Sequence, residues 1–485
     1  MAAVSEVIGQ ASSEPVIQAG ARRIAGAYPF LLPNHPLLQN TDAKLIDEKL
    51  SSEVNATDHA LFADFLSVAS SHHLFEGWCF LSKTAYALAS GKANAAIHLG
   101  YYAELRAARS LLACGGIHIG NNKHFLLKKT GEVVLLDREL PEQEKEVSLI
   151  DTVKYRFMNA VDSLRGNLAP QKQQRQFGTH VATWAVLKHW TQSREIVRDF
   201  ANRMPALTYG GIDWVRACNS TQHGSEVVAD WLSDWCFDLK QLSNDSILRN
   251  SASYGVHLGP NAFPVFDGTF VDIVLKAATA SIEFDNDNND QFDLILLSDF
   301  CFKTFRMLSR TSQELNRIKE RRDQRMFNRL RRHLVNVAGI PMADATDLLR
   351  RVRDATLLPG FSVITSAANN QRNATGVFSR AFLLLRLANS MHRWYWEQVR
   401  QLLPTAQTWQ ADLINMQAVH ANLATAPGMI ATYFDLAEDT RDAITEIETW
   451  RTGRHYTGHD LWSEMRSEIC ELCRLERVAI WSSSP

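Results

Sequence analysis

Residues 94–137 read NAAIHLGYYAELRAARSLLACGGIHIGNNKHFLLKKTGEVVLLD, a strongly helical run followed by a loop and a short hairpin. Apolar side chains recur in its first half at spacings of four, four, three and four residues, which is one face of an α-helix. They are Ile97, Tyr101, Leu105, Ala108 and Leu112. The Gly115–Gly116 pair predicts the end of this helix. Residues 125–127 and 133–136 flank a Lys-Thr-Gly turn, which predicts a short β-hairpin after a His-rich loop.

The composition of the whole chain is that of an ordinary globular protein. Of the 485 residues, 46% are hydrophobic and 21% are charged, which disfavours global disorder. The formal net charge of −2 gives no overall attraction to nucleic acids or membranes, and seven dispersed cysteines predict no disulfide framework. No apolar run is long enough to span a bilayer, so we expect a cytoplasmic protein without a membrane partner.

Helical patterns dominate outside the opening stretch as well. The central segment 243–268 is rich in Ser, Asn, Gly and Pro and has no sustained period, which predicts loops and short strands. We therefore expect a mainly α protein, a multi-helix bundle with a small β-hairpin and an irregular central region. The expected helices cover 42–50, 58–69, 76–90, 94–113, 148–164, 181–202, 225–242, 291–308, 312–337, 376–402, 409–424, 429–450 and 461–480.

The length of the chain exceeds what a single hydrophobic core normally supports. We expect an N-terminal helical domain with the hairpin over residues 1–140. A middle helical and irregular region over 141–270 and a C-terminal helical domain over 271–485 would follow it.

Two familiar ligand-binding motifs are incomplete in this sequence. Residues 115–120 have the glycine spacing of a P-loop, but Asn121 and Asn122 stand where the phosphate-binding Lys and the Ser/Thr belong. Residues 285–290 resemble the first half of a calcium-binding loop, yet the twelfth position is Leu296 rather than a bidentate Glu. The sequence therefore predicts neither a P-loop nucleotide site nor an EF-hand.

A basic run over residues 306–332 contains ten Arg and Lys residues against three acidic ones. If the run is helical, arginines along one side could neutralise successive phosphates of RNA or DNA. The alternative is a solvated face that pairs with the acidic segment 435–448. The candidate nucleic-acid-binding residues are Arg317, Arg321, Arg325, Arg329 and Arg332.

Residues 93–137 also resemble a known family. A Tyr-Tyr-Ala helix with later Ala and Leu-Leu positions, a Gly-containing loop and a following Lys-His pair is similar to the early half of HEPN domains. The residues that carry this resemblance are Tyr101, Tyr102, Ala103, Ala107, Leu111, Leu112, Gly115, Gly116, Lys123 and His124. The resemblance implies a helical bundle that often dimerises. It also implies a metal-independent ribonuclease of a bacterial antiviral defence or toxin system.

The nuclease motif of that family is an Arg, four to six intervening residues and a His. In such a motif the His moves protons at the ribose 2′-hydroxyl and the leaving group, while the Arg stabilises the charged phosphate. Arg454 and His459 form our preferred catalytic pair, because a polar residue directly follows the Arg. Packing in a helix accounts adequately for the pair at Arg386. The four pairs that fit the spacing are Arg175/His180, Arg216/His223, Arg386/His392 and Arg454/His459.

The same C-terminal region permits a metal-site interpretation. His455 and His459 are followed by Cys470 and Cys473, which places four nitrogen and sulfur ligands within nineteen residues. Zinc favours four such ligands in a tetrahedron, although both cysteines fall in a continuous amphipathic helical pattern, where cysteines are often core residues. The ribonuclease interpretation requires no cofactor, and zinc at these four residues is the alternative.

We therefore expect an RNA-directed, HEPN-like effector that acts on RNA and pairs with a second copy or with an operon-encoded protein. The alternative is a non-catalytic helical scaffold or sensor subunit that binds a protein partner or nucleic acid.

Overall fold

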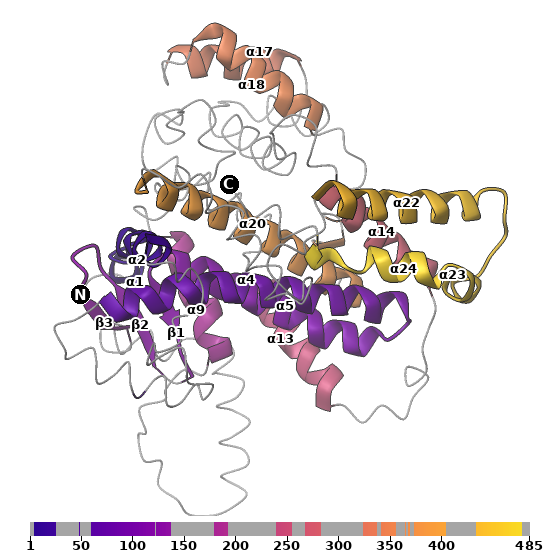
Figure 1. The fold of residues 1–485 in the computed structure, drawn as a ribbon, viewed down its shortest axis with the longest axis horizontal. Coiled ribbons are helices and arrows are strands. Elements are labelled where there is room, and N and C mark those ends of the chain that lie inside the picture. The colour runs from indigo at the N-terminus through magenta and orange to yellow at the C-terminus, as the bar shows by residue number, and fades with distance from the viewer. Residues whose placement is uncertain are drawn as a thin grey trace, which may run out of the picture. The chain divides into compact units, whose positions relative to one another are not determined.

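The computed structural model describes residues 4–25, 48, 60–121, 123–136, 179–192, 239–254, 267–282, 324–336, 341–355, 364, 367–368, 373–403 and 433–477. These residues form thirteen helices and one three-stranded antiparallel sheet (Figure 1). They fall into two compact units, the first drawn from residues 1–69 and 112–193 and the second from residues 70–111 and 194–485. The mainly α fold with a small hairpin is confirmed, whereas the division into three domains stays a prediction.

The first unit is built around the sheet β1 (Ile117–Ile119), β2 (His124–Leu127) and β3 (Val133–Leu135). In this sheet β1 pairs with β2 and β2 pairs with β3, with Ile117 opposite Leu126 and Leu127 opposite Val133. The β2–β3 hairpin confirms the prediction within one residue at each boundary. β1 lies in the segment that we expected to be a His-rich loop, so that expectation was wrong.

Helices α1 (Val4–Ile8), α2 (Glu14–Ala25) and α9 (Thr179–Gln192) complete the first unit. Its aromatic core joins the sheet to the start of α4 (Ala60–Ala89), where the Phe65 ring centroid lies 4.9 Å from that of His118. Phe62 meets Phe125 edge to face at 6.1 Å. The Thr179 hydroxyl donates to the Gly120 carbonyl at 2.9 Å, which ties the start of α9 to the end of β1.

In the second unit, α4 and α5 (Ala93–Cys114) pack against the long helix α20 (Ala374–Gln401). The helices approach closely at glycines, because a Cβ atom at Gly77 would lie 2.6 Å from Leu385 and one at Gly100 would lie 2.8 Å from Val377. The Trp78 indole donates to Asn389 at 2.9 Å. Most residues of α20 are buried, including several polar ones, and its N-cap side chain is Asn373.

The C-terminal part of the second unit is an antiparallel arrangement of short and long helices. Here α22 (Tyr433–Arg451) packs against α24 (Arg466–Leu472) and α14 (Gly268–Ile282), and α23 (Gly458–Glu464) connects α22 to α24 (Figure 1). An ion pair of 2.6 Å between Arg451 and Asp272 joins α22 to α14.

Helices α17 (Gln324–Asn336) and α18 (Met342–Ala355) form a hairpin. α17 buries Phe327, Leu330 and Leu334, and α18 buries Ala345 and Leu349. Both helices are strongly amphipathic, and Arg332 and Arg350 are exposed on positions away from this apolar stripe.

Three further expectations about helices were wrong. A single helix, α4, replaces the two expected at 58–69 and 76–90. Residues 70–75 contain neither Gly nor Pro, so nothing in them breaks the helix. The buried Ser71 hydroxyl is also satisfied, because it lies 2.9 Å from His392 Nε2. α13 (Leu239–Tyr254) is helical where loops and strands were expected. The last helix is divided, since Met465 has φ −115° and ψ 30° between α23 and α24.

Several expected helices lie outside the described residues. The segments 148–164, 291–308 and 409–424 lie wholly outside them, as does 42–50 apart from residue 48. Of the expected helices 225–242 and 312–337, the parts 225–238 and 312–323 lie outside. Among the helices that the structure describes, none has both the length and the apolar character required for a membrane span.

Candidate functional site

The preferred pair Arg454 and His459 lies on the connection between α22 and α23. Gly453 has φ 73°, so the chain turns through the left-handed region directly after α22. Thr457 then starts α23 with a capping box, in which its hydroxyl accepts from the Asp460 amide at 3.2 Å and its amide donates to the Asp460 carboxylate at 2.8 Å. His459 is consequently the second residue of α23, and its side chain is exposed.

Arg454 is held in place but remains accessible to solvent. Its guanidinium lies 5.1 Å from the Trp450 ring centroid, and its Nη1 lies 3.4 Å from Glu464 Oε2. The Trp450 indole donates to the same carboxylate oxygen at 2.9 Å. The Arg454 and Glu464 side chains are 54% and 56% exposed, and a surface ion pair of this kind contributes only about 0–1 kcal/mol. A phosphate could therefore displace Glu464 from Arg454 at small cost.

Arginines and aromatic rings alternate on the surface around this pair. Arg451 lies 5.9 Å from the Tyr456 ring, which in turn lies 5.1 Å from the Trp450 ring. Stacked rings and guanidinium planes are the groups with which proteins hold unpaired RNA bases and phosphates. We call this set the arginine–aromatic surface. It comprises Trp450, Arg451, Arg454, Tyr456, Trp462 and Arg466.

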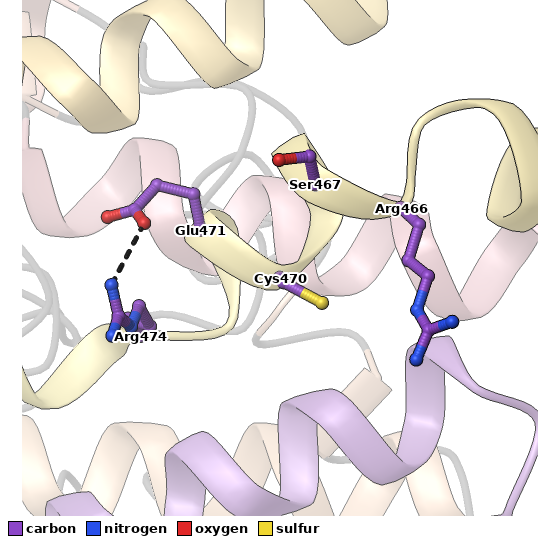
Figure 2. A pocket seen from close by; sticks show the side chains of 5 residues that line it. All are labelled: Arg466, Ser467, Cys470, Glu471 and Arg474. Carbon is purple, nitrogen blue, oxygen red and sulfur yellow. Dashed lines mark hydrogen bonds and ion pairs between the residues drawn. The ribbon is translucent and has the colours of Figure 1, made fainter.

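A groove of about 480 Å³ lies beside α24 (Figure 2). In Figure 2 Cys470 lies between Arg466 and Arg474, and Arg474 is paired with Glu471 at 3.3 Å. Arg477 also pairs with Glu471, at 2.6 Å, so the one carboxylate in the groove is already neutralised. The groove therefore presents positive charge, and it shares Arg466 of α24 with the arginine–aromatic surface.

The four candidate zinc ligands lie in different environments. His455 and His459 are exposed, Cys470 is half-buried and Cys473 is buried. Burial, together with the neighbouring Cys470, raises the pKa of the Cys473 thiol well above its usual value, which disfavours the thiolate that zinc requires. In the part of the chain that the structure describes, no three His, Cys, Asp or Glu side chains are grouped so that they could hold a metal ion.

The pair Arg386 and His392 lies in the core of the second unit. Both side chains are buried in α20, at 1% and 0% exposure, and the His392 ring contacts Tyr395 and Trp396 at 5.9 and 5.7 Å. This pair is inaccessible to RNA as the chain is folded here. Of the remaining pairs, His180 lies on α9, while Arg175 and the pair Arg216/His223 lie outside the described residues.

The predicted basic stripe is described in part. Arg332 is exposed on α17, Arg325 and Arg329 belong to the same helix, and Arg317 and Arg321 lie outside the described residues. Together α17 and α18 contain seven arginines and three aspartates. The hairpin therefore carries a net positive charge.

The residues of the HEPN-like segment are mostly structural in their placement. Tyr101, Leu111 and Leu112 are buried in α5, and His124 is buried in β2. Gly116 has φ 87°, and a Cβ atom there would lie 2.4 Å from the Ser12 carbonyl oxygen. These positions support the fold around the glycine pair and the hairpin.

A polar cluster between α4 and α5 was missed by the sequence analysis. Glu76 Oε2 forms an ion pair with Arg106 Nε at 3.0 Å, Glu76 Oε1 lies 3.3 Å from His72 Nε2, and Arg106 Nη1 lies 3.0 Å from His73 Nδ1. The His72-His73 pair and an Arg on the neighbouring helix were visible in the sequence, but nothing in their spacing linked helices α4 and α5.

Comparison of the chain with protein families, curated proteins and solved structures found no match.

Proposed function

We propose that the chain is an RNA-directed effector that binds single-stranded RNA at the arginine–aromatic surface and cleaves it with Arg454 and His459. The observation that carries this proposal is the exposure of both side chains on one short connection beside the tilted ring pair of Trp450 and Tyr456. A HEPN-like origin in a bacterial defence or toxin system is the biological setting that the resemblance of residues 93–137 suggests.

The proposed chemistry requires no metal. His459 accepts the proton of a ribose 2′-hydroxyl as the 2′-oxygen attacks the adjacent phosphorus. The bond from phosphorus to the 5′-oxygen breaks, His459 returns the proton to that oxygen, and a 2′,3′-cyclic phosphate remains. Arg454 leaves Glu464 and stabilises the additional negative charge on the phosphate oxygens in the transition state.

Purified full-length protein and end-labelled single-stranded RNA test this proposal. We expect cleavage that survives chelation of metals and falls at least about a hundredfold in His459→Ala, the typical contribution of a general acid–base. His455→Ala is the matched control, because His455 is also exposed, lies four residues away and has no role in the mechanism. Equal cleavage by His459→Ala and the unmodified protein would overturn the assignment, and loss of activity on chelation would favour the zinc alternative.

A non-catalytic role in binding nucleic acid is supported by a separate observation. The α17–α18 hairpin carries excess positive charge, and Arg332 is exposed on it. A protein that binds RNA phosphates in this way loses affinity as salt rises, and removal of one phosphate contact lowers the salt slope by about one. RNA binding that weakens in Arg332→Ala, without cleavage by the unmodified protein, would favour this sensor or scaffold role.

A further inference from the structure

Helix α13 docks on α5 through polar side chains. Asp245, Arg249 and Ser253 follow one another at intervals of four residues and so share one face of α13. The Ser253 hydroxyl lies 2.6 Å from His98 Nδ1, and the Arg249 guanidinium lies 5.2 Å from the Tyr101 ring. Asp245 is at the buried end of this face, at 1% exposure. These contacts fix α13 to α5 by charge and hydrogen bonding.

At that buried end, two carboxyl groups meet a single guanidinium. Arg380 of α20 holds Asp245 through two hydrogen bonds of 2.5 and 2.6 Å, and its Nη1 donates to the Ala368 carbonyl at 2.7 Å. Glu104 of α5 is 0% exposed, and its Oε1 lies 3.8 Å from Arg380 Nε. Among the described residues, the cluster therefore has two acidic groups for one positive charge, and none of the three residues is more than 1% exposed.

The geometry leaves Glu104 without a donor of its own. The fork of Arg380 is engaged by Asp245 and Ala368, and no donor among the described residues makes a hydrogen bond to either carboxylate oxygen of Glu104. An ionised carboxylate in such a place is very unfavourable. Two carboxyl groups can hydrogen-bond to each other only when a proton lies between them.

The charges around the cluster favour the same protonation state. Burial raises the pKa of Glu104 well above its usual value, the charge of Asp245 raises it further, and Arg380 opposes both. Burial also raises the pKa of Asp245, against the effect of Arg380. Along the same interface, burial and then the charge of Arg249 lower the pKa of His98. Among the described residues of α13 and α20, Arg249 and Arg380 bring positive charge to α5, and the lowered pKa of His98 favours its neutral form.

We propose that Glu104 and Asp245 bind one proton between them, and that this proton makes the docking of α13 on α5 dependent on pH. Docking takes up the proton, because undocking removes Asp245 and leaves Glu104 with Arg380 alone, so the pKa of Glu104 then lies no higher than its ordinary value. The docked state is favoured most at low pH. It weakens as pH rises from that ordinary value of 4.5 to the raised pKa of the pair, by up to about tenfold per pH unit.

Hydrogen exchange measured by mass spectrometry on the full chain tests the proposal. We expect the opening equilibrium of the α13 amides, corrected for intrinsic exchange rates, to rise by up to about tenfold per unit between pH 5.5 and 8.5. In Glu104→Gln the opening equilibrium of α13 should change less than about twofold over this pH range. The amide of Gln carries no charge, so Asp245 stays ionised beside Arg380 and the cluster binds no proton in this range. The infrared band of protonated carboxyl groups at neutral pH should also lose intensity in this variant.

Two variants keep the test decisive. Asp245→Asn should flatten the pH profile in the same way, since Glu104 can then pair with Arg380, and it replaces Glu104→Gln if that variant does not fold. Glu76→Gln is the matched control on α4, and it should retain the full pH slope in α13. A flat profile in the unmodified protein, or an unchanged slope in both neutralised variants, would overturn the proposal.

Discussion

Replacement of Gly116 by Ala tests the close approach that shapes the first unit. Gly116 has φ 87°, and its carbonyl accepts from the Leu127 amide at 2.8 Å. The Ser12 amide donates to the Leu127 carbonyl at 2.9 Å, so the three backbone segments hold one another in place. An added Cβ atom at Gly116 would lie 2.4 Å from the Ser12 carbonyl oxygen. Because that oxygen belongs to the backbone, it cannot rotate away as a flexible side chain would.

The expected loss of stability has two parts. The left-handed backbone conformation costs about 1–2 kcal/mol for a residue with a Cβ atom. The overlap with Ser12 adds about 1–3 kcal/mol, the usual range for an overpacked interior, which gives a total of about 2–5 kcal/mol. Gly131 is the matched control, because it has φ 84° in the hairpin turn and a Cβ atom there would have no neighbour within 4 Å. Gly131→Ala should therefore cost only the backbone part.

The assay is the free energy of opening of the β1 and β2 amides, measured by hydrogen exchange on both variants. We expect Gly116→Ala to lower this free energy by at least about 1 kcal/mol more than Gly131→Ala does, since the difference isolates the overlap. Asn tolerates the left-handed region, so Gly131→Asn should be nearly neutral while Gly116→Asn stays destabilised. Equal losses in the two alanine variants would refute the argument from the Ser12 contact.

Three other perturbations have defined outcomes. Arg380→Met should destabilise the chain by about 3–5 kcal/mol in urea unfolding at neutral pH, because it removes the counter-charge of buried Asp245, and acid should restore part of the loss. Burial alone would raise the pKa of Glu76, but hydrogen bonds from two histidines and the charge of Arg106 hold it well below 4.5. Its stabilisation is then present above pH 4.5 and lost as pH falls further, and an acid titration of unfolding should show a smaller loss in Glu76→Gln. Thr457→Ala should loosen α23 by about 1 kcal/mol in hydrogen exchange, whereas Thr457→Ser should keep the cap; no difference between them would argue against the capping box.

Elements with a clear period or a turn signal could be predicted from the sequence. The apolar stripe through Tyr101 and Leu112 predicted α5, and the Lys-Thr-Gly turn predicted the hairpin, because both signals are local. α13 escaped prediction since its docking face carries Asp245, Arg249 and Ser253 in place of an apolar stripe. β1 was not predicted, because a strand of three residues is too short to show an alternating pattern. Its strand conformation comes from pairing with β2, which the sequence of β1 alone does not indicate.

Placement of the candidate site depended on tertiary structure. Arg386/His392 and Arg454/His459 both fit the Arg–His spacing. The structure buries Arg386/His392 in α20, whereas Arg454 and His459 are exposed at the start of α23 and just before it. Burial of α20 comes from α4, more than three hundred residues away in the sequence, and no local pattern records it. The cluster of Glu104, Asp245 and Arg380 was hidden for the same reason, because it joins three distant helices.

The burial of Arg386 and His392 affects how genetic screens on this protein should be interpreted. His392→Ala would remove the partner of the Ser71 hydroxyl and leave a void among aromatic rings, and Phe-sized voids of this kind cost about 3–5 kcal/mol. Such a variant would score as inactive because destabilised chains are degraded in the cell, even though the imidazole is buried away from any surface site. Phenotypes should therefore be normalised to the cellular abundance of each variant. Substitutions that lower activity at normal abundance will then identify residues of the functional site.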